Sequence, residues 1–260
     1  MLEIKNVTIC YKNRPTVKNF SMTLQQGEIA SLVGESGSGK TTVIRAVLGL
    51  LAGGGKVTEG DILFEGQSLL NNTPSQWRKL RGTDISMIFQ DSGAMLNPTR
   101  KIGAVFVEYI RTHENTGKAD AWKKGVEMLE RMRLPSGESI MNSYSFQLSG
   151  GMRQRVGIAM AMTFQPKLLL ADEPTSALDV TTQAQIVRQM MELRDRYGTS
   201  IIMVTHNLGV AAYMSNLIVV MKDGEIADMG NRDEILSGNH SAYTQKLLDA
   251  VPALGGVRYV

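Results

Sequence analysis

The chain has 260 residues, 43% hydrophobic and 20% charged, and is long enough to bury a sizeable core as one large domain or two small ones. Its net charge of +3 is small, and its basic residues are spread along the sequence. This argues against nucleic-acid binding, for which a stripe of basic residues is expected. The single cysteine, Cys10, excludes an intrachain disulfide and a cysteine-built metal cluster.

The N-terminal part of the chain reads as strands. Apolar residues lie near strand spacing from Leu2 to Tyr11, a polar turn follows over 12–15, and residues 21–24 read as the returning strand. The apolar run 29–33 is typical of a strand buried on both faces. A helix is predicted from residue 42 and should end at the glycines 53–55.

Between that buried strand and that helix lies Gly34-Glu35-Ser36-Gly37-Ser38-Gly39-Lys40-Thr41, which fits G-x-x-x-x-G-K-[ST]. Glycines let successive N–H groups point at one anion, and the helix N-terminus adds partial positive charge. Lys40 can reach the β- and γ-phosphates of a nucleotide, and the Thr41 hydroxyl can bind Mg²⁺. The alternative is a glycine-rich turn that binds nothing, and the flanking strand and helix argue against it.

The second half of the chain alternates between strands and helices. Residues 56–66 and 85–89 read as strands, and the pattern changes to loops and helices from Asp91 to about Ala161. In this stretch Trp122, Val126, Leu129 and Met132 recur at helical spacing. Strands at 168–171 and 200–204 enclose a helical stripe that Gly198 ends, and residues 217–229 form a hairpin. The alternation predicts an α/β core interrupted by a helical insertion.

Polar residues follow three of the buried strands. Asp172 and Glu173 end one strand, His206 follows the next, and Gln90 follows residues 85–89. Ligands of parallel sheets bind at the carboxyl ends of the strands, so these side chains suit a Mg²⁺ shell, an attacking water and a γ-phosphate contact. Separately, each could be structural: an acidic strand end, a satisfied histidine, a surface glutamine. Their combination with the glycine loop favours the chemical role.

A second glycine turn, Leu148-Ser149-Gly150-Gly151-Met152, opens a helix predicted from Met152 to Phe164. Its N-terminus is also suited to an anion. One γ-phosphate needs only one cradle, so this second turn makes sense if it serves a nucleotide held by another subunit.

Together these motifs resemble an ABC-transporter ATPase. The resemblance covers about residues 1–235: Walker A at 34–42, Q-loop at Gln90, signature at 148–152, Walker B at 168–173, D-loop at 176–179 and switch histidine at His206. It implies an α/β P-loop NTPase core with a parallel sheet, an antiparallel β subdomain, an inserted α-helical subdomain over 91–161 and a C-terminal tail over 236–260. Residues 33–40, 87–91, 96–98, 149–155 and 171–175 further resemble the oligopeptide, dipeptide and nickel importer branch.

The resemblance implies a role for each matching position. Tyr11 would stack on adenine, Glu173, His206 and Gln90 would be catalytic, and Thr41, Gln90 and Asp172 would hold Mg²⁺. The residues that bind ATP would be Gly34, Ser36, Gly37, Ser38, Gly39, Lys40, Thr41 and Thr42. The residues that reach a partner's ATP would be Ser149, Gly150, Gly151 and Met152.

The resemblance also implies partners: a second ABC ATPase subunit (a paralogue in a heterodimer), two membrane permease subunits and an extracytoplasmic solute-binding protein, with no nucleic acid. With no signal peptide and no apolar run long enough to span a bilayer, we expect a peripheral position on the cytoplasmic face of the membrane. Two departures from the branch are Ser92-Gly93 and Asn207. The short C-terminal end without cysteines resembles the nickel importer ATPase more than the peptide importers.

Two other interpretations stay open. A soluble ABC ATPase of DNA repair or translation is the alternative, although no coiled-coil insertion, tandem cassette or basic surface is visible. A nucleotide-gated subunit that barely hydrolyses ATP is a third, and Glu173 argues against it.

Overall fold

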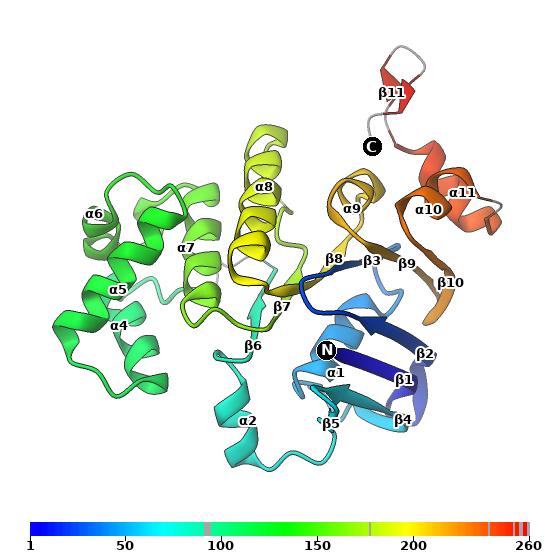
Figure 1. Ribbon diagram of the computed structural model, residues 1–260, viewed down its shortest axis with the longest axis horizontal. Helices are drawn as coiled ribbons and strands as arrows, with labels where there is room; N and C mark the ends of the chain where they lie inside the picture. The colour runs from blue at the N-terminus through cyan, green and yellow to red at the C-terminus, as the bar shows by residue number, and fades with distance from the viewer. Residues whose placement is uncertain (91–94, 177, 239, 252, 255–256, 259–260) are drawn as a thin grey trace. The chain divides into compact units, whose positions relative to one another are not determined.

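The computed structural model describes residues 1–90, 95–176, 178–238, 240–251, 253–254 and 257–258. The chain forms two compact units (Figure 1). The first unit comprises residues 1–78 and 200–260, and the second comprises residues 79–199. Both contain strands and helices, in agreement with the predicted α/β class.

An antiparallel sheet opens the first unit. Its four strands lie in the order β2-β1-β4-β5, with the bounds β1 Leu2–Tyr11, β2 Arg14–Leu24, β4 Lys56–Phe64 and β5 Gln67–Ser68. The turn between β1 and β2 is shorter than predicted. Lys12 and Asn13 both have positive φ, 47° and 63°, so a two-residue hairpin turn suffices and β2 resumes at Arg14.

The predicted parallel strands of this unit surround β3 (Ile29–Val33), whose five residues are all buried. β3 pairs in parallel with β8 (Ser200–Thr205) on one side and β9 (Leu217–Lys222) on the other. β10 (Glu225–Gly230) returns antiparallel to β9 through Asp223 and Gly224, which confirms the predicted hairpin. The glycine loop at 34–41 and the residues after β8 therefore leave the sheet at the same edge.

The helix after the glycine loop, α1 (Lys40–Val47), ends earlier than predicted. Its last turn closes at Gly49, which has a φ of 63°, and the Leu50 N–H donates to the Arg45 carbonyl at 2.8 Å. The Trp77 ring covers Gly49 so closely that a Cβ there would lie 2.4 Å from it. The stop therefore comes from Gly49 rather than from the three glycines at 53–55.

The C-terminal helices pack on the parallel strands. α9 (Leu208–Met214), α10 (Arg232–Ser237) and α11 (Ala242–Asp249) contribute to a buried cluster with Val33 and Val220 of the sheet. The predicted boundary between residues 235 and 236 falls inside α10. Ile235 before this boundary and Leu248 after it both belong to the buried cluster. Two short strands, β11 (Ala253–Leu254) and β12 (Val257–Arg258), follow.

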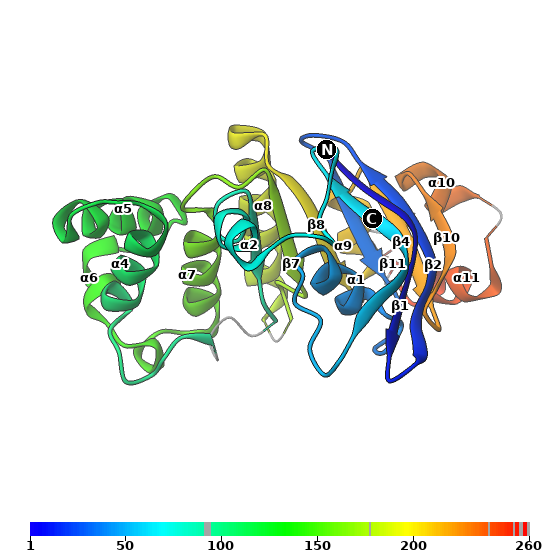
Figure 2. The same ribbon diagram turned by 90° about the horizontal axis from the view of Figure 1, so that it is seen from below.

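The second unit has a pair of parallel strands, β6 (Ile85–Ile88) and β7 (Leu168–Asp172), and a group of helices (Figure 2). The helices are α4 (Ile102–His113), α5 (Lys118–Arg131), α6 (Gly137–Asn142), the short 3-10 helix η1 (Ser145–Gln147), α7 (Gly150–Met162) and α8 (Val180–Tyr197). α2 (Pro74–Leu80) precedes them. α4 to α6 and all but the last residue of α7 lie within the predicted insertion, whose first four residues are outside the described part.

The predicted stripe of α5 is correct at Leu129 and at Met132, which directly follows the helix, and wrong at its other two positions. Ala121, Gly125, Met128 and Leu129 are buried, whereas Trp122 and Val126 are half-buried. A Cβ at Gly125 would lie 2.8 Å from the Met141 side chain of α6, so the small residues face the neighbouring helices and allow close packing. Gly198, with a φ of 67°, ends α8 as predicted. Within the described ranges, no helix combines the length and the apolar character that crossing a membrane requires.

Candidate functional site

The phosphate loop (Gly34–Thr41) leaves β3 and turns directly into α1. Gly34, Gly37 and Gly39 have φ values of 153°, 84° and 100°, a region that residues with side chains rarely adopt. A Cβ at Gly34 would lie 2.2 Å from the Met221 carbonyl oxygen, and one at Gly39 would lie 2.9 Å from Val17. Glycine is therefore required at both positions by backbone conformation and by space.

Lys40 is the first residue of α1 and only 5% exposed. Its ammonium group donates hydrogen bonds to the Gly34 carbonyl at 2.8 Å, the Glu35 carbonyl at 2.7 Å and the Ser38 hydroxyl at 3.1 Å. A buried ammonium held at the start of a helix adds a full charge to the partial charge of the helix N-terminus. Thr41 and Thr42 follow it, both half-buried. The loop can therefore receive an anion such as a phosphate.

His206 lies at the same edge of the sheet. Val33 pairs with Thr205 in parallel register, so Gly34 and His206 each follow a member of that pair. His206 is exposed, and the next residue, Asn207, caps α9 by accepting a hydrogen bond from the Val210 N–H at 3.2 Å. Asparagine and aspartate are equally good caps, so Asn207 fulfils the local structural role that aspartate would.

Tyr11 ends β1 beside the hairpin turn. Its ring lies against Gly55, where a Cβ would come within 2.6 Å of the Tyr11 ring. The partner strand of that hairpin, β2, contacts the phosphate loop through Val17. A Cβ at Gly39 of the loop would lie only 2.9 Å from the Val17 side chain. The antiparallel sheet that carries Tyr11 therefore adjoins the phosphate loop in the first unit.

Gln90, Asp172 and Glu173 gather in the second unit. Ile88 pairs with Ala171 in parallel register, and Gln90 and Glu173 each lie two residues beyond this pair. The Gln90 side-chain amide donates a hydrogen bond to the Glu173 carboxylate at 3.4 Å. Asp172 is 2% exposed, and Glu173 has a φ of 44°, an uncommon backbone conformation for a residue with a side chain.

The signature segment (Ser149–Met152) forms the start of α7. The Ser149 hydroxyl caps the helix by accepting a hydrogen bond from the Met152 N–H at 3.3 Å. Gly151 packs against Thr182 at the start of α8, where a Cβ would lie 2.8 Å from the threonine methyl group. Ser149 and Gly150 are exposed. The segment thus offers a solvent-facing helix N-terminus backed by α8.

Asp179 begins α8 and belongs to the predicted D-loop, whose Ala177 is outside the described residues. Its carboxylate accepts hydrogen bonds from the Thr182 hydroxyl at 2.7 Å and the Thr182 N–H at 2.9 Å. These bonds lower the pKa of Asp179. The D-loop acid is therefore an N-cap in this structure.

The structure groups the predicted residues by unit. The phosphate loop, Tyr11 and His206 belong to the first unit, whereas Gln90, Asp172, Glu173 and the signature segment belong to the second. Sequence reasoning missed Tyr243, whose hydroxyl accepts a hydrogen bond from the Glu35 N–H of the phosphate loop at 2.9 Å. Ser241 could have indicated this helix, because serine is a common N-cap residue. It caps α11 by accepting a hydrogen bond from the Thr244 N–H, which places Tyr243 in the first turn.

Comparison with known proteins gives consistent matches. The family model described as ABC transporter matches residues 17–176. The chain is 41% identical to a dipeptide transport ATP-binding protein of Lactococcus lactis subsp. cremoris, over 98% of this chain and 74% of the relative. It is 42% identical to an oligopeptide transport ATP-binding protein of Haemophilus influenzae, over 98% of this chain and 80% of the relative. A dimeric ATP-binding cassette in a post-hydrolysis state with ADP and Pi matches with a TM-score of 0.79 and 30% identity, over 89% of this chain and 99% of that chain.

Proposed function

The chain belongs to the ABC transporter family and is an ATP-binding and ATP-hydrolysing subunit, and we propose that it powers a binding-protein-dependent importer of di- or oligopeptides. The observation that carries the proposal is the phosphate loop. Gly34 and Gly39 leave no room for a Cβ, and the buried Lys40 lies at a helix N-terminus, so the loop is suited to surround an anion.

In this proposal the loop residues from Gly34 to Thr42 hold the phosphates of ATP and Tyr11 stacks on the adenine. The Thr41 hydroxyl, the Gln90 amide oxygen and the Asp172 carboxylate are oxygen donors of the kind that Mg²⁺ prefers. When bound, Mg²⁺ neutralises charge on the β- and γ-phosphates. Lys40 donates to phosphate oxygens while it keeps its hydrogen bond to the Gly34 carbonyl.

Glu173 is the proposed general base, because its carboxylate follows a buried strand and can accept a proton from the attacking water. The Gln90 amide beside it can orient that carboxylate and report on the site, since the two side chains already share a hydrogen bond. His206 is proposed to contact the γ-phosphate from the edge that it shares with the phosphate loop.

The signature segment is proposed to complete the ATP site of a second cassette. What supports this is its exposed helix N-terminus, capped by Ser149 and followed by Gly150 and Gly151. Two cassettes would then bind two ATP molecules between them, and a paralogue is the proposed second subunit. Closure on ATP and opening after hydrolysis would drive the transport cycle.

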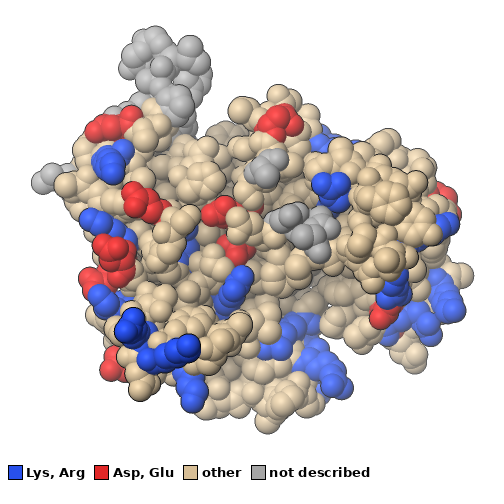
Figure 3. All heavy atoms as spheres, turned by 180° about the vertical axis from the view of Figure 1, so that it is seen from behind, with Lys and Arg blue, Asp and Glu red and all other residues tan. Residues whose placement is uncertain are grey.

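The inserted helices are proposed to bind the permease, through which the chain would lie peripherally at the cytoplasmic face of the membrane. A groove of about 730 Å³ is lined mainly by residues of α4 and α5. Its lining includes Trp122, one acidic residue, Glu108, and four basic residues, Arg100, Lys101, Arg111 and Lys118. Figure 3 shows Lys and Arg side chains at several places on the face opposite to that of Figure 1. The charge favours an acidic, amphipathic helix as the occupant.

The cargo is proposed to be a peptide that an extracytoplasmic solute-binding protein delivers, because the sequence relatives are named as dipeptide and oligopeptide transport proteins. These names favour a peptide over a nickel chelate. The test is uptake of labelled dipeptides, oligopeptides and nickel by cells that lack the chain. Peptide uptake should be lost, restored by the wild-type chain and not by Lys40→Ala. Loss of nickel uptake with unchanged peptide uptake would contradict the proposed cargo.

A second experiment addresses the permease. Reversing the groove charge with Lys101→Glu and Arg111→Glu should release the chain from permease-containing membranes while its ATP affinity stays unchanged. Lys123→Glu, an exposed position of α5 outside the groove, is the matched control and should stay bound. Membrane binding that survives the double reversal would rule out this docking surface.

A further inference from the structure

The phosphate loop has a hydrogen-bond partner from the C-terminal end of the chain. The Glu35 N–H donates to the Tyr243 hydroxyl at 2.9 Å, across 208 positions of sequence. The same peptide unit carries the Gly34 carbonyl, which accepts a hydrogen bond from the Lys40 ammonium at 2.8 Å. Because a trans peptide is planar with its N–H and C=O on opposite sides, the two bonds hold one peptide plane from both sides.

This arrangement links Tyr243 to the position of the lysine. Rotation of the Gly34–Glu35 peptide would move the carbonyl away from Lys40 and break the Tyr243 bond together with it. Gly34 has a φ of 153° and no Cβ, so its own side chain does not prevent such a rotation. A hydrogen bond to a residue outside the loop, such as the one to Tyr243, can therefore fix this peptide.

Tyr243 is itself held in place. Its ring is half-buried against the core cluster that includes Val33 and Leu248, and the Lys222 ammonium lies 5.3 Å from the ring centroid. Burial raises the pKa of the Tyr243 hydroxyl above its ordinary value, so the group is neutral at physiological pH. A neutral hydroxyl has a lone pair available for the Glu35 N–H.

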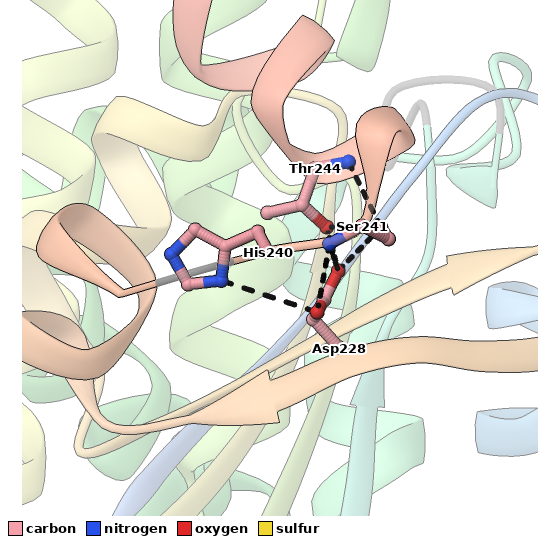
Figure 4. Close-up of polar contacts among 4 residues, drawn as sticks. All are labelled: Asp228, His240, Ser241 and Thr244. Carbon is pink, nitrogen blue, oxygen red and sulfur yellow. Dashed lines mark hydrogen bonds and ion pairs between the residues drawn. The ribbon is translucent and has the colours of Figure 1, made fainter.

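The start of α11, from which Tyr243 projects, is fixed to β10 by Asp228 (Figure 4). The Asp228 carboxylate accepts a hydrogen bond from the Ser241 hydroxyl at 2.5 Å and one from the Thr244 hydroxyl. It also accepts from the Ser241 N–H at 3.3 Å, and His240 Nδ1 lies 3.9 Å away. A continuous series of contacts thus runs from β10 through α11 to the phosphate loop.

We propose that Tyr243 is a positioning residue for the ATPase reaction: its hydroxyl fixes the Gly34–Glu35 peptide in the orientation that places the Lys40 ammonium for phosphate binding. This rests on the proposed role of the phosphate loop in binding ATP. A merely structural tyrosine would act through its ring, whereas a positioning tyrosine acts through its oxygen, and Tyr243→Phe separates the two.

The experiment measures Mg-ATP binding and steady-state ATPase kinetics of Tyr243→Phe, with Tyr213→Phe as a matched control on the 53%-exposed tyrosine of α9. One lost hydrogen bond of ordinary strength corresponds to about a 3- to 10-fold change in an equilibrium constant. Tyr243→Phe should raise the Kd and KM for ATP by that factor, with kcat within twofold and the melting temperature nearly unchanged. The control should match the wild type in all four quantities.

Lys40→Ala separates failure of this proposal from failure of the proposed function. If Lys40→Ala loses ATP binding while Tyr243→Phe binds within twofold of the wild type, the positioning role is wrong and the ATP site stands. If Lys40→Ala binds ATP like the wild type, the role of the loop is wrong, and the positioning role with it. Amide hydrogen exchange adds a variant-independent test: the Glu35 amide of the wild-type chain should exchange slowly, and fast exchange there would overturn the hydrogen bond.

Discussion

Replacing Glu173 with glutamine should remove most ATP turnover and leave ATP binding intact. Glutamine has the same shape and suits the same backbone, and the turn at residue 173 does not depend on its side chain. The Glu173 carbonyl accepts hydrogen bonds from the Ser176 N–H at 3.1 Å and the Ser176 hydroxyl at 3.0 Å. The side-chain bond from Gln90 is long, at 3.4 Å, so its loss should cost less than about 0.5 kcal/mol of folding free energy.

The catalytic cost is much larger. A positioned general base contributes about 10²- to 10⁴-fold in rate, which is about 3–5 kcal/mol of activation free energy. We therefore expect kcat of Glu173→Gln to fall by about two to four orders of magnitude, with Kd for Mg-ATP within about threefold of the wild type. The assay is phosphate release by the chain assembled with its transporter, together with equilibrium ATP binding by the isolated chain.

Glu192→Gln is the control for this comparison, because it makes the same chemical change on α8, where Glu192 pairs with Arg133 at 2.9 Å on the surface. It should leave kcat and Kd unchanged. If Glu173→Gln lowered binding and turnover equally, or left turnover normal, Glu173 would not be the general base.

Three further predictions concern other parts of the chain. Ser149→Asp preserves a cap on α7 but adds a negative charge, so it should stop ATPase activity of the assembled complex without changing ATP affinity of the isolated chain. Ser149→Ala should cost about 1 kcal/mol of stability and lower the activity of the complex less than Ser149→Asp does. Asp228→Asn should lower the free energy of unfolding by about 1.5–3 kcal/mol at neutral pH, because it weakens the bonds to Ser241 and Thr244. Tyr109→Phe removes a 3.0 Å bond to the Gly82 carbonyl and should cost about 0.5–1.5 kcal/mol, measured by urea unfolding.

The pH dependence of two of these effects checks their cause. Burial opposes the ionisation of Asp228, but hydrogen bonds from Ser241 and Thr244 outweigh it and lower the pKa below 3.8. The stability difference between the wild type and Asp228→Asn should therefore be full above that value and shrink as pH falls through the folded pKa. Burial raises the pKa of Tyr109 from 10.0 to about 12, so its contribution should be full below pH 10 and vanish as pH rises toward 12. Differences that stayed constant with pH would assign the effects to packing instead.

The sequence predicts the phosphate loop and the parallel strands well because the signals are local. The run 29–33 is mostly apolar and is buried throughout. Gly198 ends α8, and the pair Asp223-Gly224 ends β9, each with the positive φ that glycine, and less often aspartate, adopts. The end of α1 is predicted wrongly because the chain offers glycines at 49 and at 53–55, and it is Gly49, with a φ of 63°, that ends the helix. The Trp77 ring, far along the chain, packs over Gly49 and leaves no room for a Cβ there, a contact that exists only in the folded chain.

Only part of the site can be predicted from the sequence, because some of its residues are brought together by contacts between distant parts of the chain. The residue types at the strand ends predict which side chains share an edge, and the parallel registers account for Gln90 lying beside Glu173. The bond from Glu35 to Tyr243 joins residues 208 positions apart, and Asp228, which fixes α11, lies in a strand where nothing in the sequence marks it as a helix anchor. Such partners become visible only when the chain is folded.

The most direct test of the central claim, that the phosphate loop binds ATP through its β- and γ-phosphates, is a titration of the wild-type chain and Lys40→Ala with ATP and with AMP. Two charge-assisted hydrogen bonds correspond to about 10²- to 10⁴-fold in affinity. The wild type should bind ATP at least about a hundredfold more tightly than AMP, and Lys40→Ala should lose most of that preference. Equal affinity of the wild type for the two nucleotides, or an unchanged preference in Lys40→Ala, would contradict the claim.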